Sequence, residues 1–383
     1  MYRKLLIAGA VCALAAGCGK DVPAPGTEAV ASSSYYTLRD VAQLLAGVPL
    51  GKEQAAEVHD AALSSALNGY DHEYLMKDVF ENPGAGIGDE LTKAAGNYAR
   101  PLRDLLREAV GETKAAGRYD PSLLDALENS DVQIYWPYPE DWDGNSLPVV
   151  TFDPGNPDDA TNVGYLPGGE KVLVDEQMAK ERPVWVVSNN RDGAFTSLEM
   201  LRREDPSWGQ GGGEIIVRPR AAADKTEMKT LVLRSFKAYR QYDSWFAGAS
   251  EYFVKMGSVT DMTASTEAEM RLYYPSITDF MIVVRRSEVN RDVPFNAVLI
   301  SEWVKGLDKC AFLITEDDGG STTNWKCDVN VVYNSKKYGV EINLPVRTRD
   351  DIVWRGTLTR GYIEKYDGQS VRFGDVDLVL ELI

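Results

Sequence analysis

The sequence predicts an α+β protein in which a small N-terminal helical domain is followed by β-rich domains, the last of them a β-sandwich. Apolar residues recur at helical spacing between residues 35 and 128, and the spacing changes to a period of two from Asp131. Short apolar runs separated by turn residues then continue to residue 383. With 44% hydrophobic and 26% charged residues, the composition is globular, and 383 residues suffice for two or three domains.

Residues 1–17 have the pattern of a lipoprotein signal peptide. Arg3 and Lys4 precede an apolar run at 5–14, and small residues follow up to Cys18. The apolar run is much shorter than the roughly 20 residues that span a bilayer. We predict that residues 1–17 are removed and that Cys18 is lipidated, with palmitate among its acyl groups. The alternative is a plain signal peptide or a transmembrane helix with an incidental cysteine.

Residues 18–34 are predicted to be a flexible tether, because they are rich in Pro, Gly, Ser and Ala and lack apolar periodicity. Gly19, rather than aspartate, follows the cysteine, which permits sorting to the outer membrane under the enterobacterial sorting code. Lys20-Asp21 partly resembles the basic–acidic signal that sends lipoproteins of Bacteroidota to the cell surface. We therefore predict a lipid-anchored protein of the cell envelope at the outer membrane, facing either the periplasm or the surface.

The helical domain is predicted to span residues 35–128. Thr37 with Asp40 three residues later forms a capping-box pattern at the start of the first helix. Apolar residues then share one face of that helix, and Pro101 suits the first turn of the last one. The predicted helices lie at 38–48, at 53–67, at 70–80 and from about 101 onward.

The remaining chain is predicted to form a β-rich domain at 129–220 and a β-sandwich domain at 230–383. Val132, Ile134 and Trp136 alternate with Gln133 and Tyr135 in the first strand. Further strands are predicted at 147–152, 171–174, 183–188 and 214–218. In the last domain the predicted strands lie at 230–236, 250–256, 279–285, 296–304, 310–315, 325–333, 338–346 and 376–382.

Two cysteines remain after Cys18, and they suggest a disulfide. An even pair in an exported chain is a disulfide candidate. A symmetric hairpin about the turn at 317–320 would place Cys310 opposite Cys327, within disulfide reach. The same register puts Trp325, Cys327, Val329, Val331 and Tyr333 on the buried face. We predict a Cys310–Cys327 disulfide; the alternative is two buried thiols.

The formal charge of −17 argues against a nucleic-acid partner. Without Arg3 and Lys4, 39 basic side chains oppose 58 acidic ones, so the formal charge after removal of the signal peptide is −19. Nucleic-acid binding requires a basic surface, which this chain lacks. The excess of acid is compatible with binding of divalent cations or with a solvated surface alone.

No catalytic motif is present in the sequence, so we predict no catalytic residue. The two histidines, His59 and His72, both lie in the helical domain. The chain has no HExxH zinc motif and no G-x-S-x-G nucleophile elbow. The glycines at 83–88 follow no predicted strand and therefore do not indicate a nucleotide loop.

Acidic loops are the candidate metal site. Ca²⁺ takes about six to eight oxygen ligands, commonly from loops. Asp317 and Asp318 lie in one predicted loop of the last domain, and Asp350 and Asp351 lie in another. A β-sandwich can bring two such loops to the same end. This arrangement loosely resembles the calcium loops of C2-type sandwiches. We therefore take these four carboxylates as candidate Ca²⁺ ligands; the alternative is that they are solvated turn residues.

Aromatic residues in loops are the candidate binding residues. Tyr138 and Trp142 lie in a Pro-rich loop, and Trp208 lies in a glycine-rich one. Exposed, rigid rings stack on sugars or anchor a protein partner. Trp136 continues the buried face of its strand and is predicted to be a core residue instead.

Several stretches resemble a group of uncharacterised cell-envelope lipoproteins of Bacteroidota. They are the lipobox with its tether, the helical stretch ALNGYDHEYL at 66–75, the block VQIYWPYPEDWDGNSLPVV at 132–150, and PVWVVSNN at 183–190. The resemblance spans most of the chain. It implies an envelope location and a helical segment followed by β domains, and it transfers no activity or catalytic residue.

Two functional hypotheses follow. The favoured one is a lipid-anchored envelope protein without catalysis, which binds a protein or glycan partner or a cation through loops of its β-rich domains. The alternative is an anchored hydrolase of glycosidase type that uses a pair of carboxylates.

Overall fold

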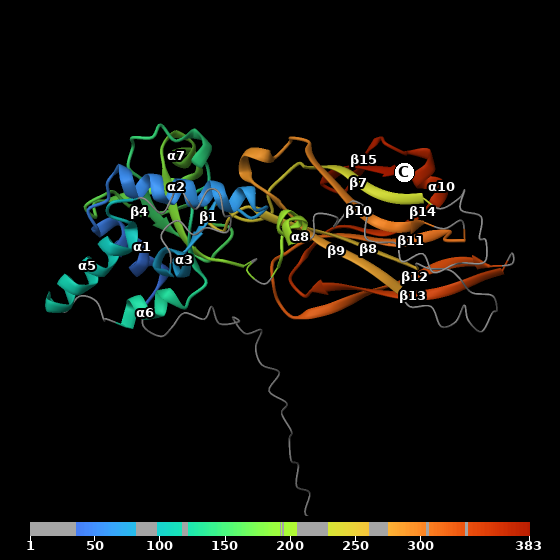
Figure 1. Ribbon diagram of the computed structural model, residues 1–383, viewed down its shortest axis with the longest axis horizontal. Helices are drawn as coiled ribbons and strands as arrows, with labels where there is room; N and C mark the ends of the chain where they lie inside the picture. The colour runs from blue at the N-terminus through green and yellow to red at the C-terminus, as the bar shows by residue number, and fades with distance from the viewer. Residues whose placement is uncertain are drawn as a thin grey trace, which may run out of the picture. The chain divides into compact units, whose positions relative to one another are not determined.

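A computed structural model describes residues 36–81, 98–116, 122–191, 193, 195–204, 229–259, 275–303, 306–333 and 336–383. The predicted signal peptide, Cys18, the tether, Trp208 and the predicted strand at 214–218 lie outside these ranges. The described chain is a mixed α+β protein, with its longer helices before residue 129 and β-rich parts after it (Figure 1). The predicted fold class is confirmed at this level, and the described residues belong to one compact unit.

The helices of the first part form at the amphipathic segments of the sequence. The predicted capping box is present, because Thr37 Oγ1 accepts from the Asp40 N–H and Asp40 Oδ2 accepts from the Thr37 N–H. The segment predicted as a helix at 70–80 instead contains a short strand, which pairs with a later strand, before a helix begins. The helices are α1 (Leu38–Gly47), α2 (Lys52–Leu67), α3 (Met76–Glu81), α5 (Leu102–Ala116) and α6 (Ser122–Glu128).

A six-stranded sheet follows, in the order β1-β2-β6-β3-β4-β5. Its pairs are antiparallel except for β3 with β6, which is parallel. The strands are β1 (Glu73–Leu75), β2 (Val132–Tyr135), β3 (Val149–Phe152), β4 (Thr161–Tyr165), β5 (Lys171–Asp175) and β6 (Val184–Asn189). The shorter helices of this part are η1 (Pro139–Asp141), α7 (Glu176–Glu181) and α8 (Leu198–Glu204).

Alternating residues of this sheet face two different cores. Ile134 and Trp185 pack in a core with the helices, and α1 contacts β3, β4 and β6 (Figure 1). Tyr135 and Val186 belong to a second core on which α7 packs. Because an amphipathic helix buries its apolar stripe against a sheet, the predicted helical region at 35–128 and the β-rich region at 129–220 share one core.

The described part of residues 229–383 contains two four-stranded antiparallel sheets and a two-stranded one, in the orders β10-β7-β16-β15, β14-β11-β8-β9 and β12-β13. All eight strands predicted here are present, and β14 and β15 are additional. The strands are β7 (Lys229–Ala238), β8 (Ser250–Val259), β9 (Pro275–Val284), β10 (Val293–Trp303), β11 (Lys309–Glu316), β12 (Thr322–Tyr333), β13 (Lys336–Arg347), β14 (Asp351–Thr359), β15 (Ser370–Phe373) and β16 (Val376–Leu382). The helices are η3 (Arg286–Glu288) and α10 (Arg360–Lys365).

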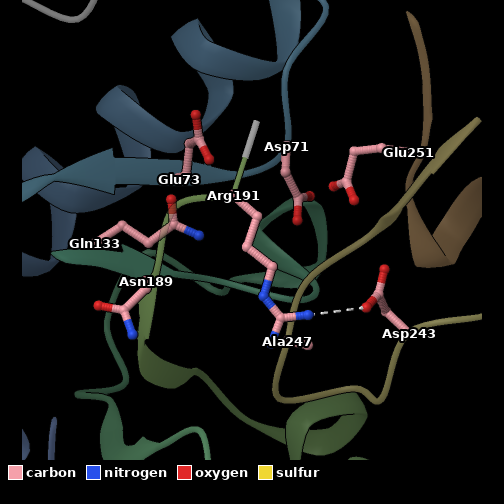
Figure 2. A pocket seen from close by; sticks show the side chains of 8 residues that line it. All are labelled: Asp71, Glu73, Gln133, Asn189, Arg191, Asp243, Ala247 and Glu251. Atoms are coloured by element: carbon pink, nitrogen blue, oxygen red, sulfur yellow. Dashed lines mark ion pairs between the residues drawn. The ribbon is translucent and has the colours of Figure 1, made fainter. Parts of the chain in front are cut away.

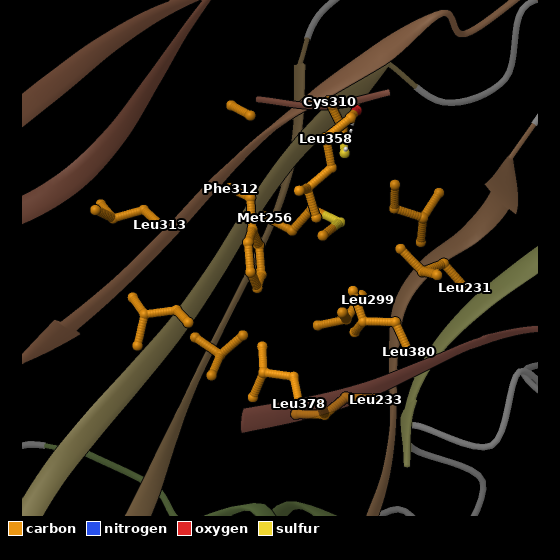
Figure 3. Packing of buried hydrophobic residues seen from close by; sticks show 14 of the residues in the cluster. Leu231, Leu233, Met256, Leu299, Cys310, Phe312, Leu313, Leu358, Leu378 and Leu380 are labelled. Carbon is orange, nitrogen blue, oxygen red and sulfur yellow. Dashed lines mark hydrogen bonds between the residues drawn. The ribbon is translucent and has the colours of Figure 1, made fainter. Parts of the chain in front are cut away.

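The three sheets share one apolar core (Figure 3). Leu233 and Leu378 enter it from β7 and β16, and Met256 and Phe312 enter it from β8 and β11. Ile342 of β13 belongs to the same core, so the two-stranded sheet also contributes to it. The shared core explains why the alternating apolar residues of these strands are buried.

The predicted Cys310–Cys327 disulfide is wrong, because the register on which it was based does not form. Strand β11 already has β8 on one side and β14 on the other, so no edge remains for β12. The turn after β11 contains Gly319 and Gly320 at positive φ and leads the chain into the separate β12–β13 sheet. Cys310 therefore lies opposite Leu358, and both cysteines are free. The predicted inward face of β12 is confirmed in part: Val329 and Val331 are buried, and Trp325 and Cys327 are half-buried against the same core, while Lys326 and Asp328 are exposed.

The loop at 240–250 belongs to the part after residue 228 and packs against the part before residue 205. Trp245 and Phe246 stack on each other and are buried in the second core of the six-stranded sheet. Arg285, after β9, donates to the carbonyl oxygens of Ala66 and Tyr70 at 2.5 and 2.8 Å. The junction is thus made of buried rings and of hydrogen bonds to backbone carbonyls.

We predict that Glu57 makes the protein less stable as the pH rises from about 4.5 to 7. Glu57 is fully buried and accepts from the Leu102 N–H at 2.6 Å, at the start of α5. Burial raises the pKa of Glu57 from 4.5 to about 7. Because the folded state holds this proton more tightly than the unfolded chain, the stabilisation is complete below the unfolded pKa. It is lost as the pH rises through the folded pKa, by at most about 3 kcal/mol.

Urea unfolding of the wild type and of Glu57→Gln, between about pH 4.5 and 8, measures this effect. The free energy of unfolding of the wild type, relative to the variant, is expected to fall over this range. A difference that stays constant with pH would contradict the assignment.

We also predict that Cys310 and Cys327 are both thiols in protein purified without reductant. In denaturant, a chain that lacks residues 1–18 should then react with two equivalents of a disulfide reagent. In the folded protein Cys327 should react first, because Cys310 is fully buried and burial raises the pKa of its thiol to about 12. Absence of reactive thiols in denaturant would show that the disulfide forms after all.

Candidate functional site

A polar pocket lies where the loop at 240–250 meets the six-stranded sheet, and we call it the junction pocket. Figure 2 shows Arg191 extending across it toward Asp243. Four carboxylates, two carboxamides and one guanidinium line it, so its lining is rich in acid. The lining residues are Asp71, Glu73, Gln133, Asn189, Arg191, Asp243, Ala247 and Glu251.

One wall of the pocket is held by hydrogen bonds within the sheet and its loops. Glu73 lies opposite Tyr135 in the β1–β2 pair, and its carboxylate accepts from Asn190 Nδ2 at 2.9 Å. The same amide donates to Gln133 Oε1 at 3.0 Å. These bonds fix the side chains of Glu73 and Gln133 before any ligand arrives, which reduces the entropy lost on binding.

Asp71 connects this wall to the loop at 240–250. Its two carboxylate oxygens accept from the backbone N–H groups of His72 at 2.7 Å and of Ala249 at 2.8 Å. Burial raises the pKa of Asp71 above its ordinary value, while these two N–H groups oppose the rise. Asp71 is therefore a buried carboxyl group whose hydrogen bonds span the junction.

Arg191 supplies the positive charge of the pocket. Its guanidinium forms ion pairs with Asp153 at 3.8 Å and with Asp243 at 3.6 Å. The Arg191 side chain is 48% exposed, whereas those of Asp153 and Asp243 are only 11% and 7% exposed. The arginine therefore borders solvent, while the two carboxylates are largely buried.

Three carboxylates converge at the opposite wall, and we call them the acidic cluster: Asp243, Glu251 and Glu316. Asp243 comes from the loop at 240–250, Glu251 is the second residue of β8, and Glu316 is the last residue of β11. One oxygen from each lies within 4.8 Å of the other two. Asp243 and Glu251 line the junction pocket and Glu316 lies behind them, with 0% of its surface exposed.

The electrostatics of the acidic cluster are those of crowded, buried acids. Burial first, and then the charge of Asp243, raise the pKa of Glu316. Burial likewise raises the pKa of Asp243. Neither oxygen of Glu316 has a partner in hydrogen-bond geometry among the described residues, although the neighbouring Ser250 hydroxyl opposes the rise of its pKa. A cation or a shared proton would satisfy this arrangement.

The four carboxylates proposed from sequence as Ca²⁺ ligands lie around the same end of the β14-β11-β8-β9 sheet. Asp351 lies opposite Glu316 in the β11–β14 pair. The charges of Asp243 and Asp351 contribute, after burial, to raising the pKa of Asp318 to about 6. Asp317, by contrast, already accepts two hydrogen bonds from Arg347, at 2.8 and 3.2 Å. Asp350 accepts from the Arg347 N–H at 2.9 Å.

The two loop aromatics that the structure describes, Tyr138 and Trp142, pack on different cores. Tyr138 packs on the second core and donates to Glu176 at 2.8 Å. Trp142 packs on the helical core, where it stacks with His59 and Trp136, and its indole N–H donates to the Ser146 carbonyl. Trp136 is 1% exposed, as predicted. Trp208 lies outside the described residues.

The described histidines and cysteines do not form an activated nucleophile. His59 contacts the Pro139 carbonyl and Asp60, and burial lowers the pKa of His72 to about 3, so His72 is neutral. Burial raises the pKa of both the Cys310 and the Cys327 thiol. These groups therefore offer no support for nucleophilic catalysis.

Sequence reasoning missed Arg191 and the acidic cluster. Asp243 and Glu251 carry no motif, and Glu316 directly precedes Asp317 without a motif of its own. The residues come from three separate segments, so no local spacing reveals them.

Comparison with protein-family models, curated proteins and solved structures found no match to this chain. Within the part of the chain that the structure describes, no helix is long and apolar enough to cross a membrane.

Proposed function

We propose that this protein is exported to the cell envelope, attached to the membrane through lipid on Cys18, and binds a glycan in the junction pocket. The binding role is supported mainly by the junction pocket, in which carboxylates, carboxamides and a guanidinium converge from separate segments of the chain. The pocket is small, with no more than about 280 Å³ of space, so it would receive one or two polar groups of a larger ligand rather than enclose a whole sugar.

A glycan suits this pocket because its hydroxyl groups both donate and accept hydrogen bonds. The carboxylates of Glu73 and Glu251 accept only, the carboxamides of Gln133 and Asn189 do both, and Arg191 donates only. The hydrogen bonds that hold Glu73 and Gln133 mean that part of the site is ordered in advance. An apolar ligand would leave these groups unpaired.

The glycosidase alternative has less support. The buried pair Asp243 and Glu316 is the most perturbed carboxylate pair in the cluster, but Glu316 is 0% exposed and lies behind the pocket lining. A glycosidase acid or nucleophile must reach the glycosidic bond, which this residue does not do.

We also propose that residues 230–383 form a β-sandwich with C2-like loops. Two four-stranded antiparallel sheets that share a core support the sandwich. Acidic residues at one end of the β14-β11-β8-β9 sheet support the likeness to C2-type loops.

The pocket is tested by probing a glycan panel with a purified chain that lacks residues 1–18. Arg191→Ala should weaken binding of any positive glycan about tenfold or more, because a hydrogen bond to a charged group is worth about 1.5–3 kcal/mol. Asn189→Ala should weaken it about two- to tenfold, because a neutral hydrogen bond is worth about 0.5–1.5 kcal/mol. Asn145→Ala, in an exposed loop, is the matched control and should bind like the wild type. Loss of binding in Trp142→Ala but not in the pocket variants would move the site to the loop aromatics.

The anchor is tested by metabolic labelling with palmitate and by membrane fractionation. Cys18→Ser should lose the label and leave the membrane fraction, because the thiol is the point of attachment. Cys12→Ser, within the predicted signal peptide, is the control and should keep both properties. Retained labelling of Cys18→Ser would disprove the anchor and leave the pocket proposal standing.

A further inference from the structure

We propose that Asp243, Glu251 and Glu316 bind one Ca²⁺ ion at the inner wall of the junction pocket. The proposal does not require a glycan in the pocket, so it goes beyond the proposed function. It also assigns the cation to a different set of ligands from the four loop aspartates that the sequence suggested.

The spacing of the cluster fits a cation of this size. Two oxygens bound to one Ca²⁺ at about 2.3–2.6 Å lie at most about 5 Å apart. One oxygen from each of the three carboxylates lies within 4.8 Å of the others. Three carboxylates are a sufficient protein contribution, because water can occupy the coordination positions that face the pocket.

Glu316 is the second and independent observation. It has 0% of its surface exposed, and both of its oxygens lack a hydrogen-bond partner among the described residues. Glu57 is equally buried, yet it accepts from the Leu102 N–H and from the Tyr74 hydroxyl. A buried carboxylate without a donor is strongly destabilising unless it is paired or coordinates a metal. Glu57 has close donors in the protein itself, whereas for Glu316 only the Ser250 hydroxyl, which is outside hydrogen-bond geometry, opposes the rise in pKa.

The surrounding charges permit a cation. Arg191 contacts Asp243 at 3.6 Å, and about half of this arginine side chain is exposed to solvent. Arg286 uses Nη2 to donate to the backbone carbonyls of Asp243 and Gly248, not to the cluster carboxylates. The carboxyl groups of Asp318 and Asp351 lie at the same end of the sheet as Glu316. The local excess of acid therefore remains even with both arginines present.

A bound ion would connect three segments of the chain. Asp243 lies two residues before Trp245, whose ring is buried against the six-stranded sheet, while Glu251 and Glu316 belong to β8 and β11. Ca²⁺ would thus hold the loop at 240–250 to the β14-β11-β8-β9 sheet. Because a ligand that binds only the folded state stabilises it, the melting temperature should rise with Ca²⁺ concentration.

The competing arrangement is a proton shared between Glu316 and Asp243. Burial and the neighbouring charge raise the pKa of Glu316, which favours this proton in the absence of metal. The shared proton predicts no response to Ca²⁺, so the two arrangements are separable by experiment.

The test is calorimetric titration of the chain that lacks residues 1–18 with Ca²⁺. Tb³⁺ luminescence and the melting temperature of the same chain provide independent measures of ion binding. We expect one ion per chain with a Kd of about 1 mM or tighter, as in extracellular calcium modules. Glu316→Gln and Asp243→Asn should each weaken binding at least tenfold and remove the rise in melting temperature. Glu57→Gln, a substitution at an equally buried but partnered glutamate, should bind Ca²⁺ like the wild type.

Three results would overturn the proposal. The first is no binding and no thermal shift of the wild type at about 5 mM Ca²⁺, well above the expected Kd; this measurement stands even if a variant fails to fold. The second is unchanged Ca²⁺ binding by a folded Glu316→Gln. The third is binding abolished by Asp350→Asn/Asp351→Asn but retained by Asp243→Asn, which would return the site to the loop aspartates.

Discussion

The burial of Trp245 and Phe246 against the six-stranded sheet is the interaction on which the rest of the structure depends. The loop at 240–250 carries these rings into a core built by residues such as Tyr135 and Val186. Burying two large aromatic side chains supplies a large apolar contribution. It also positions Asp243 at the junction, so the same segment provides both the packing and part of the polar site.

Acidic groups gather at this junction at an electrostatic cost. Asp71, Asp243 and Glu316 are all removed from water, and burial raises the pKa of each. Backbone N–H groups compensate Asp71, and Arg191 partly compensates Asp243. The three buried carboxyl groups thus differ in how well hydrogen bonds and ion pairs offset the cost of their burial. Buried polar groups with incomplete partners are typical of sites that bind a ligand or an ion.

Local patterns predicted much of the fold correctly. The Thr37–Asp40 capping box, the eight strands after residue 229 and the inward face of β12 follow from interactions between residues near in sequence. The strand partners were not predictable in this way. The turn after β11 was found, but the chain could not reveal that β8 and β14 already occupy both edges of that strand. The disulfide prediction failed for this reason.

The sequence by itself determined the class of the fold, its excess of acid and the absence of the usual catalytic motifs, because these depend on composition and on short spacings. It also predicts a lipid anchor at Cys18. Only the tertiary structure decided which carboxylates meet, since Asp243, Glu251 and Glu316 are brought together by a loop and by the ends of two strands. Strand pairing and burial set that convergence, and neither is encoded in the spacing of any one segment.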